Sequence, residues 1–407
     1  MISHIPALFN SLIDRSSAMT LESMVVFSVF IKYNGADVKR YLDLWIYCGR
    51  KDKKLTEIKK CMADEMTPVE RKMAIEKGEA YDRIPCVPFM GELKGVLSGV
   101  SVWDLSHDPE KMAEAEIIPF NRYGYDRMDI GPNSRGITEA LGGRVVYPRQ
   151  GVPYMDVPLL DSYARLETME PVNAHTNERI QDFAGAAAIL EKTALAIVPV
   201  EMSIGGPLTI ASNLRGVERL LRDCRKKPDD VLRLMRIITD SEKSCIDLAA
   251  EYGMGTAMAD PVANPALIGP AMYEKFVYPF TKELTDYAYA KTGKKVSLHM
   301  CGMTDKIWKY FRKYQLNEVS LDNIVDLEKA ALELGEAVPI AGNVDPVEII
   351  MSGTRQEILK AVTDCIDAGL KSEKGYVLAS GCDIPETTRP EQIDVFMEAA
   401  RTYRHHL

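Results

Sequence analysis

The sequence lacks any apolar run long enough to cross a bilayer. The longest run near its start, MVVFSVFI at residues 24–31, falls well short of the roughly 20 residues that a membrane-spanning helix needs. It also lacks a basic excess, because 59 acidic residues outnumber 50 basic ones and the net charge is −9. Nucleic acids, which attract positively charged surfaces, are therefore not expected partners. We expect a protein that acts neither in a membrane nor on nucleic acid.

Cysteine is sparse, with eight residues spread over 407 positions and no secretory signal to suggest export. Thiols in such a chain are expected to be reduced, which predicts a cytoplasmic protein without a disulfide framework. The G-x-S-x-G nucleophile motif is also absent. A serine hydrolase therefore has no support from the sequence.

Short β-prone apolar runs recur from residue 84 onward, with helix-like segments between most of them. Strands that alternate with helices indicate a parallel sheet, and strands buried on both faces are expected to be almost continuously apolar. Eight such units predict an α/β fold, a (β/α)₈ TIM-type barrel. The less regular segment 132–180 is interpreted as a long loop insertion. The eight runs span residues 84–89, 127–131, 195–201, 255–260, 295–302, 318–322, 338–345 and 376–383.

The first part of the chain has a different character. The apolar clusters SMVVFSVFIKY and YLDLWIYCG are broken by NGAD and GRKDKK, which predicts helices separated by loops. We interpret residues 1–65 as an N-terminal helical extension and residues 66–407 as the barrel domain. The extension could cover the main domain or a partner subunit, or its helices could close the bottom of the barrel.

Polar and metal-binding residue types follow the proposed strands. In barrels of this kind, the chemistry takes place at the C-terminal ends of the strands. These residues are therefore candidates for one functional face. They are Glu201, Asp260, His299 with Cys301, Asp322, Asn343 with Asp345, and Cys382 with Asp383.

His299 and Cys301 form the most informative pair, since the chain contains only six histidines. Residues i and i+2 of a strand point to the same side, so both can face the mouth of the barrel while Met300 faces the helices. Cys382, at the end of the last run, could join them. One imidazole and two thiolates suit zinc, and three protein ligands leave a position open for a substrate. The competing interpretation is two buried thiols and a core histidine.

The chain from about residue 66 to 404 resembles the uroporphyrinogen decarboxylase-like superfamily. Its opening block here is MTPVERKMAIEKGEAYDRIPCVPF, followed by IGGPLTIASNLRG, DPVANPALIGPAMYEKFVYPF, LHMCG, AGNVDP and ASGCDIPETTRPEQIDVFMEAAR. True uroporphyrinogen decarboxylases carry an Arg-rich N-terminal block, whereas the equivalent FMGELKGVLSG has no arginine. The branch of zinc methyltransferases carries H-x-C…C, which His299, Cys301 and Cys382 match.

The resemblance implies a zinc-dependent methyltransferase that moves a methyl group between a small molecule and the cobalt of a corrinoid such as methylcobalamin. The D-x-H-x-x-G signature of corrinoid domains is absent, so the corrinoid is expected on a separate partner protein. The small molecule could be a thiol, a folate or a methylated donor. Asp260 and Glu201 are candidates for a resting zinc ligand or for acid–base chemistry. Asp322 and Asp345 could orient ligands, and Asn343 and Asp345 are predicted to contact the cofactor.

Two other functions stay open at this point. A metal-free decarboxylase of a tetrapyrrole would need arginines around the mouth of the barrel. A non-catalytic accessory subunit could keep the barrel, although such a subunit has no need to hold three zinc ligands in register.

Overall fold

The computed structural model describes residues 56–403. The predicted N-terminal extension, residues 1–65, therefore lies outside the described residues up to position 55. The residues from Thr56 onward belong to one compact unit. Within the described part, none of the helices has the length and apolarity that crossing a bilayer requires.

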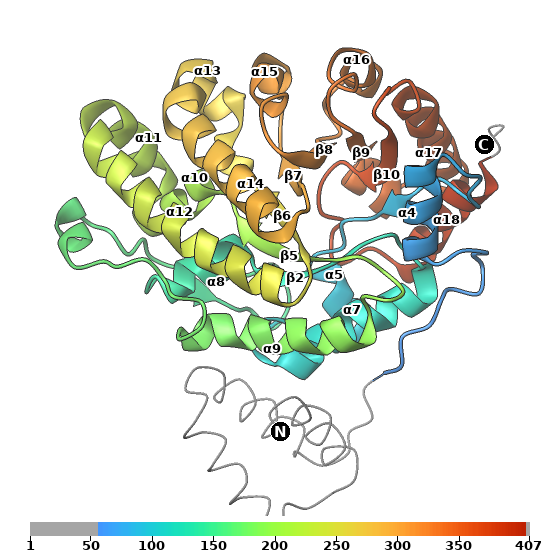
Figure 1. The fold of residues 1–407 in the computed structure, drawn as a ribbon, viewed down its shortest axis with the longest axis horizontal. Helices are drawn as coiled ribbons and strands as arrows, with labels where there is room; N and C mark the ends of the chain where they lie inside the picture. Colours follow the sequence, from blue (N-terminus) through green and yellow to red (C-terminus); the bar gives the residue numbers. More distant parts are fainter. Residues whose placement is uncertain (1–55, 404–407) are drawn as a thin grey trace, which may run out of the picture. The chain divides into compact units, whose positions relative to one another are not determined.

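Eight parallel strands form one curled sheet with helices around it (Figure 1), so the predicted α/β barrel is confirmed. The strand order is β1-β10-β9-β8-β7-β6-β5-β2, so β1 and β2 lie at the two edges of the sheet. These edges meet just before β2, where the Asp126 N–H donates to the Cys86 carbonyl at 2.8 Å. The strands are β1 (Cys86–Val87), β2 (Met128–Pro132), β5 (Val200–Gly205), β6 (Gly255–Ala259), β7 (Val296–Met300), β8 (Leu316–Leu321), β9 (Ile340–Val344) and β10 (Tyr376–Ser380).

Each strand overlaps one of the eight predicted runs, but the third run is misplaced. Residues 195–198 form the turn that follows helix α9 (Glu178–Thr193), and the strand begins only at Val200. The Ile197 and Val198 N–H groups both donate to the Ala194 carbonyl, which fixes that turn. As a consequence Glu201 is the second residue of β5 and does not lie at the strand end, contrary to the prediction.

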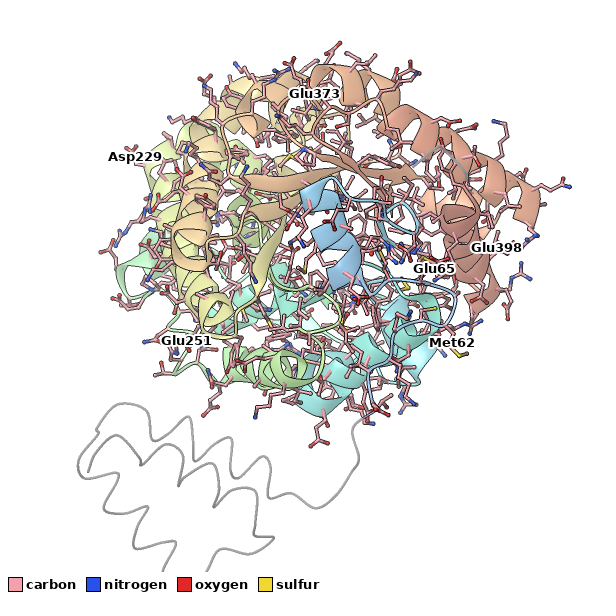
Figure 2. The ribbon with its side chains drawn as sticks, turned by 45° about the vertical axis from the view of Figure 1, so that its right-hand side comes forward. Met62, Glu65, Asp229, Glu251, Glu373 and Glu398 are labelled. Carbon is pink, nitrogen blue, oxygen red and sulfur yellow. The ribbon has the colours of Figure 1, made fainter. Side chains whose placement is uncertain are left out.

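Helices cover the outer face of the sheet because each presents one apolar stripe to it. Helix α12 buries residues at three- and four-residue spacing, among them Leu234, Ile238 and Cys245, while Asp229 and Glu251 at its two ends point to solvent (Figure 2). The remaining helices are α4 (Pro68–Lys77), α5 (Leu93–Ser98), α6 (Asp104–His107), α7 (Pro109–Tyr123), α8 (Asn133–Ala140), α9 (Glu178–Thr193), α10 (Pro207–Arg215), α11 (Val217–Lys226), α13 (Pro265–Phe276), α14 (Tyr278–Thr292), α15 (Trp308–Phe311), α16 (Leu327–Glu333), α17 (Arg355–Gly369) and α18 (Pro390–Thr402); α12 is Pro228–Glu251.

The segment 132–180 is more ordered than a loop insertion. Helix α8 follows β2 directly, and an antiparallel hairpin of β3 (Val145–Val146) and β4 (Tyr154–Met155) comes next. Helix α8 was missed because its sequence, NSRGITEA, contains a glycine and few apolar residues. Gly136 is required there by packing, since a Cβ would lie 2.8 Å from the Phe183 ring.

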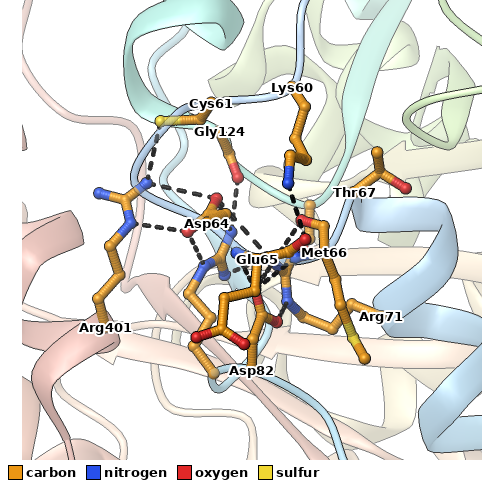
Figure 3. Close-up of polar contacts among 12 residues, drawn as sticks. Lys60, Cys61, Asp64, Glu65, Met66, Thr67, Arg71, Asp82, Gly124 and Arg401 are labelled. Atoms are coloured by element: carbon orange, nitrogen blue, oxygen red, sulfur yellow. Dashed lines mark hydrogen bonds and ion pairs between the residues drawn. The ribbon is translucent and has the colours of Figure 1, made fainter.

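A buried charge network joins the segment before α4 to the N-terminal ends of β1 and β2 (Figure 3). Arg71 and Arg83 are at most 2% exposed, and Arg83 donates to Asp64 at 3.0 Å and to Asp126 at 2.6 Å. Arg401 of α18 also donates to Asp64, at 2.8 Å. These contacts tie the first described residues and the last helix to the same end of the barrel.

Candidate active site

The structure brings His299, Cys301 and Cys382 together at the C-terminal ends of the strands. His299 lies on β7, Cys301 follows the end of that strand, and Cys382 follows the end of β10. The His299 Nε2 lies 3.3 Å from the Cys301 Sγ, and the two thiol sulfurs are 3.8 Å apart. The three ligand atoms all lie within 4.8 Å of one another, and each side chain is partly exposed. Met300, between the two β7 residues, is fully buried, as the alternation of a strand requires.

His299 is oriented from behind by a hydroxyl group. Its Nδ1 lies 2.9 Å from the Oγ of Ser320 on the neighbouring strand β8. A hydrogen bond at Nδ1 leaves Nε2, the nitrogen that faces the thiols, able to offer its lone pair to a metal. The Phe89 ring, with its centroid 5.7 Å from that of the imidazole, flanks the histidine on another side.

The two thiols affect each other's ionisation. The hydrogen bond from Cys301, assisted by nearby His299, lowers the pKa of Cys382, while the same contact raises the pKa of Cys301. A second thiolate next to the first is unfavourable unless a cation neutralises the pair. An imidazole nitrogen and two sulfurs that converge in this way fit zinc, whose preferred ligands they are.

Asp260 lies at the C-terminal end of β6 but faces helix α10. Its carboxylate accepts hydrogen bonds from the Thr209 N–H at 2.9 Å, the Thr209 hydroxyl at 2.6 Å and the Leu208 N–H at 3.3 Å. Gly206 leaves room for this contact, because a Cβ there would lie 2.0 Å from the Asp260 Cβ. Burial raises the pKa of Asp260 to about 6. Asp260 therefore fills the anion site at the N-terminus of α10 and is not part of the His–Cys–Cys cluster.

Glu201 lies deeper in the barrel than the cluster. It accepts from Ser297 at 2.9 Å, two residues before His299 on β7, and its Oε2 lies 3.1 Å from the Arg127 Nε. Arg127 also donates to Glu318 of β8 at 2.5 Å. Burial raises the pKa of Glu201 to about 7. These residues form a charged layer below His299.

The other predicted residues hold loops around the mouth. Asp322 accepts from the Gly302 N–H, directly after Cys301, at 2.7 Å. Asn343 donates to the Asp322 carbonyl at 2.9 Å, and Asp345 accepts from Asn323 at 2.7 Å. These contacts connect the β8 and β9 ends to the segment that carries Cys301.

Asp129 was missed by the sequence analysis, which considered only strand ends. It is the second residue of β2, accepts from Ser203 at 3.0 Å and from Lys94 at 2.8 Å, and keeps 50% of its side chain exposed. The signal was present in RMDIG, where Arg127 and Asp129 alternate with apolar residues. Such alternation in a buried strand marks side chains that face the interior of a barrel.

Comparison with known proteins identifies the family of the chain. The family model for uroporphyrinogen decarboxylase (URO-D) matches residues 67–403. A methylcobamide:CoM methyltransferase, MtbA, of Methanosarcina mazei is 26% identical over 347 residues, covering 84% of this chain and 99% of the relative. A methylated-thiol–coenzyme M methyltransferase of the same organism is 24% identical over 353 residues, covering 84% of this chain and 90% of the relative.

The solved structure of a methyltransferase from Methanosarcina mazei has the same fold, with a TM-score of 0.72, 23% identity and coverage of 83% of this chain and 98% of that one. The family match covers most of the chain. The chain therefore belongs to the uroporphyrinogen decarboxylase family, and within it to the methyltransferase branch.

Proposed function

We propose that this protein is a zinc-dependent methyltransferase, which moves a methyl group between the cobalt of a corrinoid on a separate protein and a small molecule. The observation that carries the proposal is the convergence of His299, Cys301 and Cys382 at the mouth of the barrel. Relatives that match over 84% of this chain and are named methylcobamide:CoM methyltransferases support the corrinoid partner. We favour a thiol as the small molecule, because a thiol fits the open position of such a site.

The chain's own residues would position the reaction. His299, Cys301 and Cys382 would hold the metal, and Ser320 would keep the imidazole in the required orientation. When bound, zinc would lower the pKa of the substrate thiol and keep its sulfur nucleophilic. The corrinoid on the partner protein would supply the methyl group to that sulfur and would keep both electrons of its cobalt–carbon bond, so that the transfer balances.

The remaining predicted residues take supporting roles in this proposal. Asp322 fixes the backbone after Cys301, while Asn343 and Asp345 hold the adjacent loops on the side from which the corrinoid would approach. Asp260 and Glu201, both already engaged by internal partners, would shape the site without binding the metal. The protein would act in the cytoplasm, where the thiols remain reduced.

The structure gives less support to a metal-free decarboxylase. Such an enzyme must bind several substrate carboxylates, but Lys94, Arg127 and Arg135 are already paired with the chain's own carboxylates. Lys94 binds Glu116 and Asp129, and Arg135 binds Glu92. Transfer of the methyl group from free methylcobalamin to 2-mercaptoethanol would test the proposal directly.

In that assay, the purified protein should consume methylcobalamin and form the methyl thioether. The variant that combines Cys301→Ser and Cys382→Ser should lose at least about 100-fold in rate, because the open metal position disappears. Cys224→Ser, a substitution of a buried thiol on α11, serves as the matched control and should leave the rate unchanged. Equal rates in the double variant and the wild type would contradict the proposal.

A further inference from the structure

Carboxylates surround the His–Cys–Cys cluster. Asp383 directly follows Cys382, and the loop between β1 and α5 packs against it. A Cβ at Gly91 would lie 3.3 Å from the Asp383 Cγ, and the Ile384 N–H donates to the Phe89 carbonyl at 2.7 Å. The Phe89 ring in turn flanks His299. Asp383 therefore belongs to the rim of the same site, and within the described residues no cation pairs with it.

The carboxylate of Asp383 at the rim and residues inside the barrel are accessible to solvent. Ala259, at the end of β6 and paired with His299 in the sheet register, is also exposed. Both carboxylates, Asp129 and Asp383, are therefore accessible to solvent, and a small molecule that enters the mouth of the barrel can contact them.

The cations of the interior are already neutralised. Lys94 donates to Glu116 at 2.7 Å and to Asp129 at 2.8 Å, and Arg127 binds Glu201 and Glu318. Arg135 binds Glu92. These three cations thus bind five carboxylates, to which Asp322 and Asp383 add two more. The three cations are Lys94, Arg127 and Arg135, and the seven carboxylates are Glu92, Glu116, Asp129, Glu201, Glu318, Asp322 and Asp383.

We propose that this charge distribution selects a neutral or cationic small thiol and rejects one that carries an anionic group near its sulfur. The inference rests on the proposed thiol substrate. A sulfonate or carboxylate a few bonds from the sulfur would lie close to Asp129 and Asp383, while Lys94, Arg127 and Arg135 are already paired with carboxylates of the chain. The relatives are named for coenzyme M, a sulfonated thiol, so the proposal separates this chain from them in substrate.

Three thiols with the same two-carbon skeleton test the charge alone: cysteamine, which is cationic, 2-mercaptoethanol, which is neutral, and coenzyme M, which is anionic. Their binding to the Co²⁺-substituted protein would be titrated through the absorbance of the cobalt–thiolate bond, which needs no turnover. We expect cysteamine and 2-mercaptoethanol to bind at least about tenfold more tightly than coenzyme M, because like charges in a partly enclosed site repel. Added salt should reduce this ratio.

The Asp383→Asn variant should reduce the preference against coenzyme M about tenfold, and it should fold because no described residue relies on that carboxylate for a hydrogen bond. Asp129→Asn should act in the same direction. Asp364→Asn, on the exposed face of α17, is the matched control and should leave the ratio unchanged. Tighter binding of coenzyme M than of 2-mercaptoethanol, or an unchanged ratio in Asp383→Asn, would overturn the inference.

The methyl-transfer rate, measured in parallel with methylcobalamin, separates this inference from the proposed function. If the thiols bind in the expected order but none becomes methylated, the transfer reaction is wrong while the charge selection holds. If transfer occurs and coenzyme M is preferred, the charge selection is wrong and the transfer reaction holds. If no thiol binds, both are wrong.

Discussion

Replacing Arg83 by methionine should destabilise the protein far more than replacing an exposed arginine. The guanidinium is about as buried as a side chain can be, at 2% exposure, and donates to Asp64, Asp126 and the carbonyls of Ile84 and Gly124. Methionine fills a similar volume but donates no hydrogen bond. The substitution therefore leaves two buried carboxylates with fewer partners.

The expected cost follows from these contacts. Removing one member of a buried ion pair typically costs about 3–5 kcal/mol. Asp64 keeps Arg401, and Asp126 keeps Arg71, so the lower end of that range, about 3 kcal/mol, is expected here. Arg122→Met is the matched comparison. Its ion pair with Asp394 is 47% and 45% exposed, and such pairs contribute about 0–1 kcal/mol.

Urea unfolding followed by circular dichroism measures the difference. The Arg83→Met midpoint should shift to lower urea with an unchanged slope, whereas the Arg122→Met midpoint should barely move. If the two variants lose the same free energy of unfolding, the buried ion pairs of Arg83 contribute no more to stability than the exposed pair of Arg122.

Two further predictions concern the site and the layer beneath it. Ser320→Ala should weaken zinc binding about 10–100-fold, because His299 loses the hydrogen bond that orients it. Ser297→Ala, which removes a contact of Glu201, should leave zinc binding unchanged. Competition with a chelating dye measures both affinities, and equal affinities in the two variants would contradict the role of Ser320. The buried carboxyl group of Glu201 should make the stability of the fold depend on pH. Burial raises its pKa from 4.5 to about 7, so the folded state holds a proton that the unfolded state has lost, and stability should fall as pH rises through that interval. Glu201→Gln should flatten this slope in unfolding experiments at several pH values, and an unchanged slope would show that another group causes it.

Much of the fold was accessible from the sequence because a parallel barrel imposes a strong local pattern. Strands buried on both faces give continuous apolar runs, and the i, i+2 spacing of His299 and Cys301 placed both on one side of β7. The convergence of Cys382 with them followed from the order of the strands, since β10 and β7 end at the same face of the barrel.

The rest depended on contacts between segments far apart in the sequence. Whether Asp260 faces the mouth or helix α10 is decided by the backbone N–H groups of residues 208 and 209, which no local pattern reveals. Glu201 was misplaced because the apolar turn before β5 has the composition of a strand. Asp129 was missed because it lies near the start of β2, away from the C-terminal strand ends, and because its partners, Lys94 and Ser203, come from other elements.

The metal content of the purified protein tests the central claim most directly. The account predicts about one zinc per chain, bound by one imidazole and two thiolates, and loss of that zinc with retention of the fold in the variant that combines Cys301→Ser and Cys382→Ser. A wild-type protein that is prepared without chelator, supplied with zinc and still binds none would contradict the account.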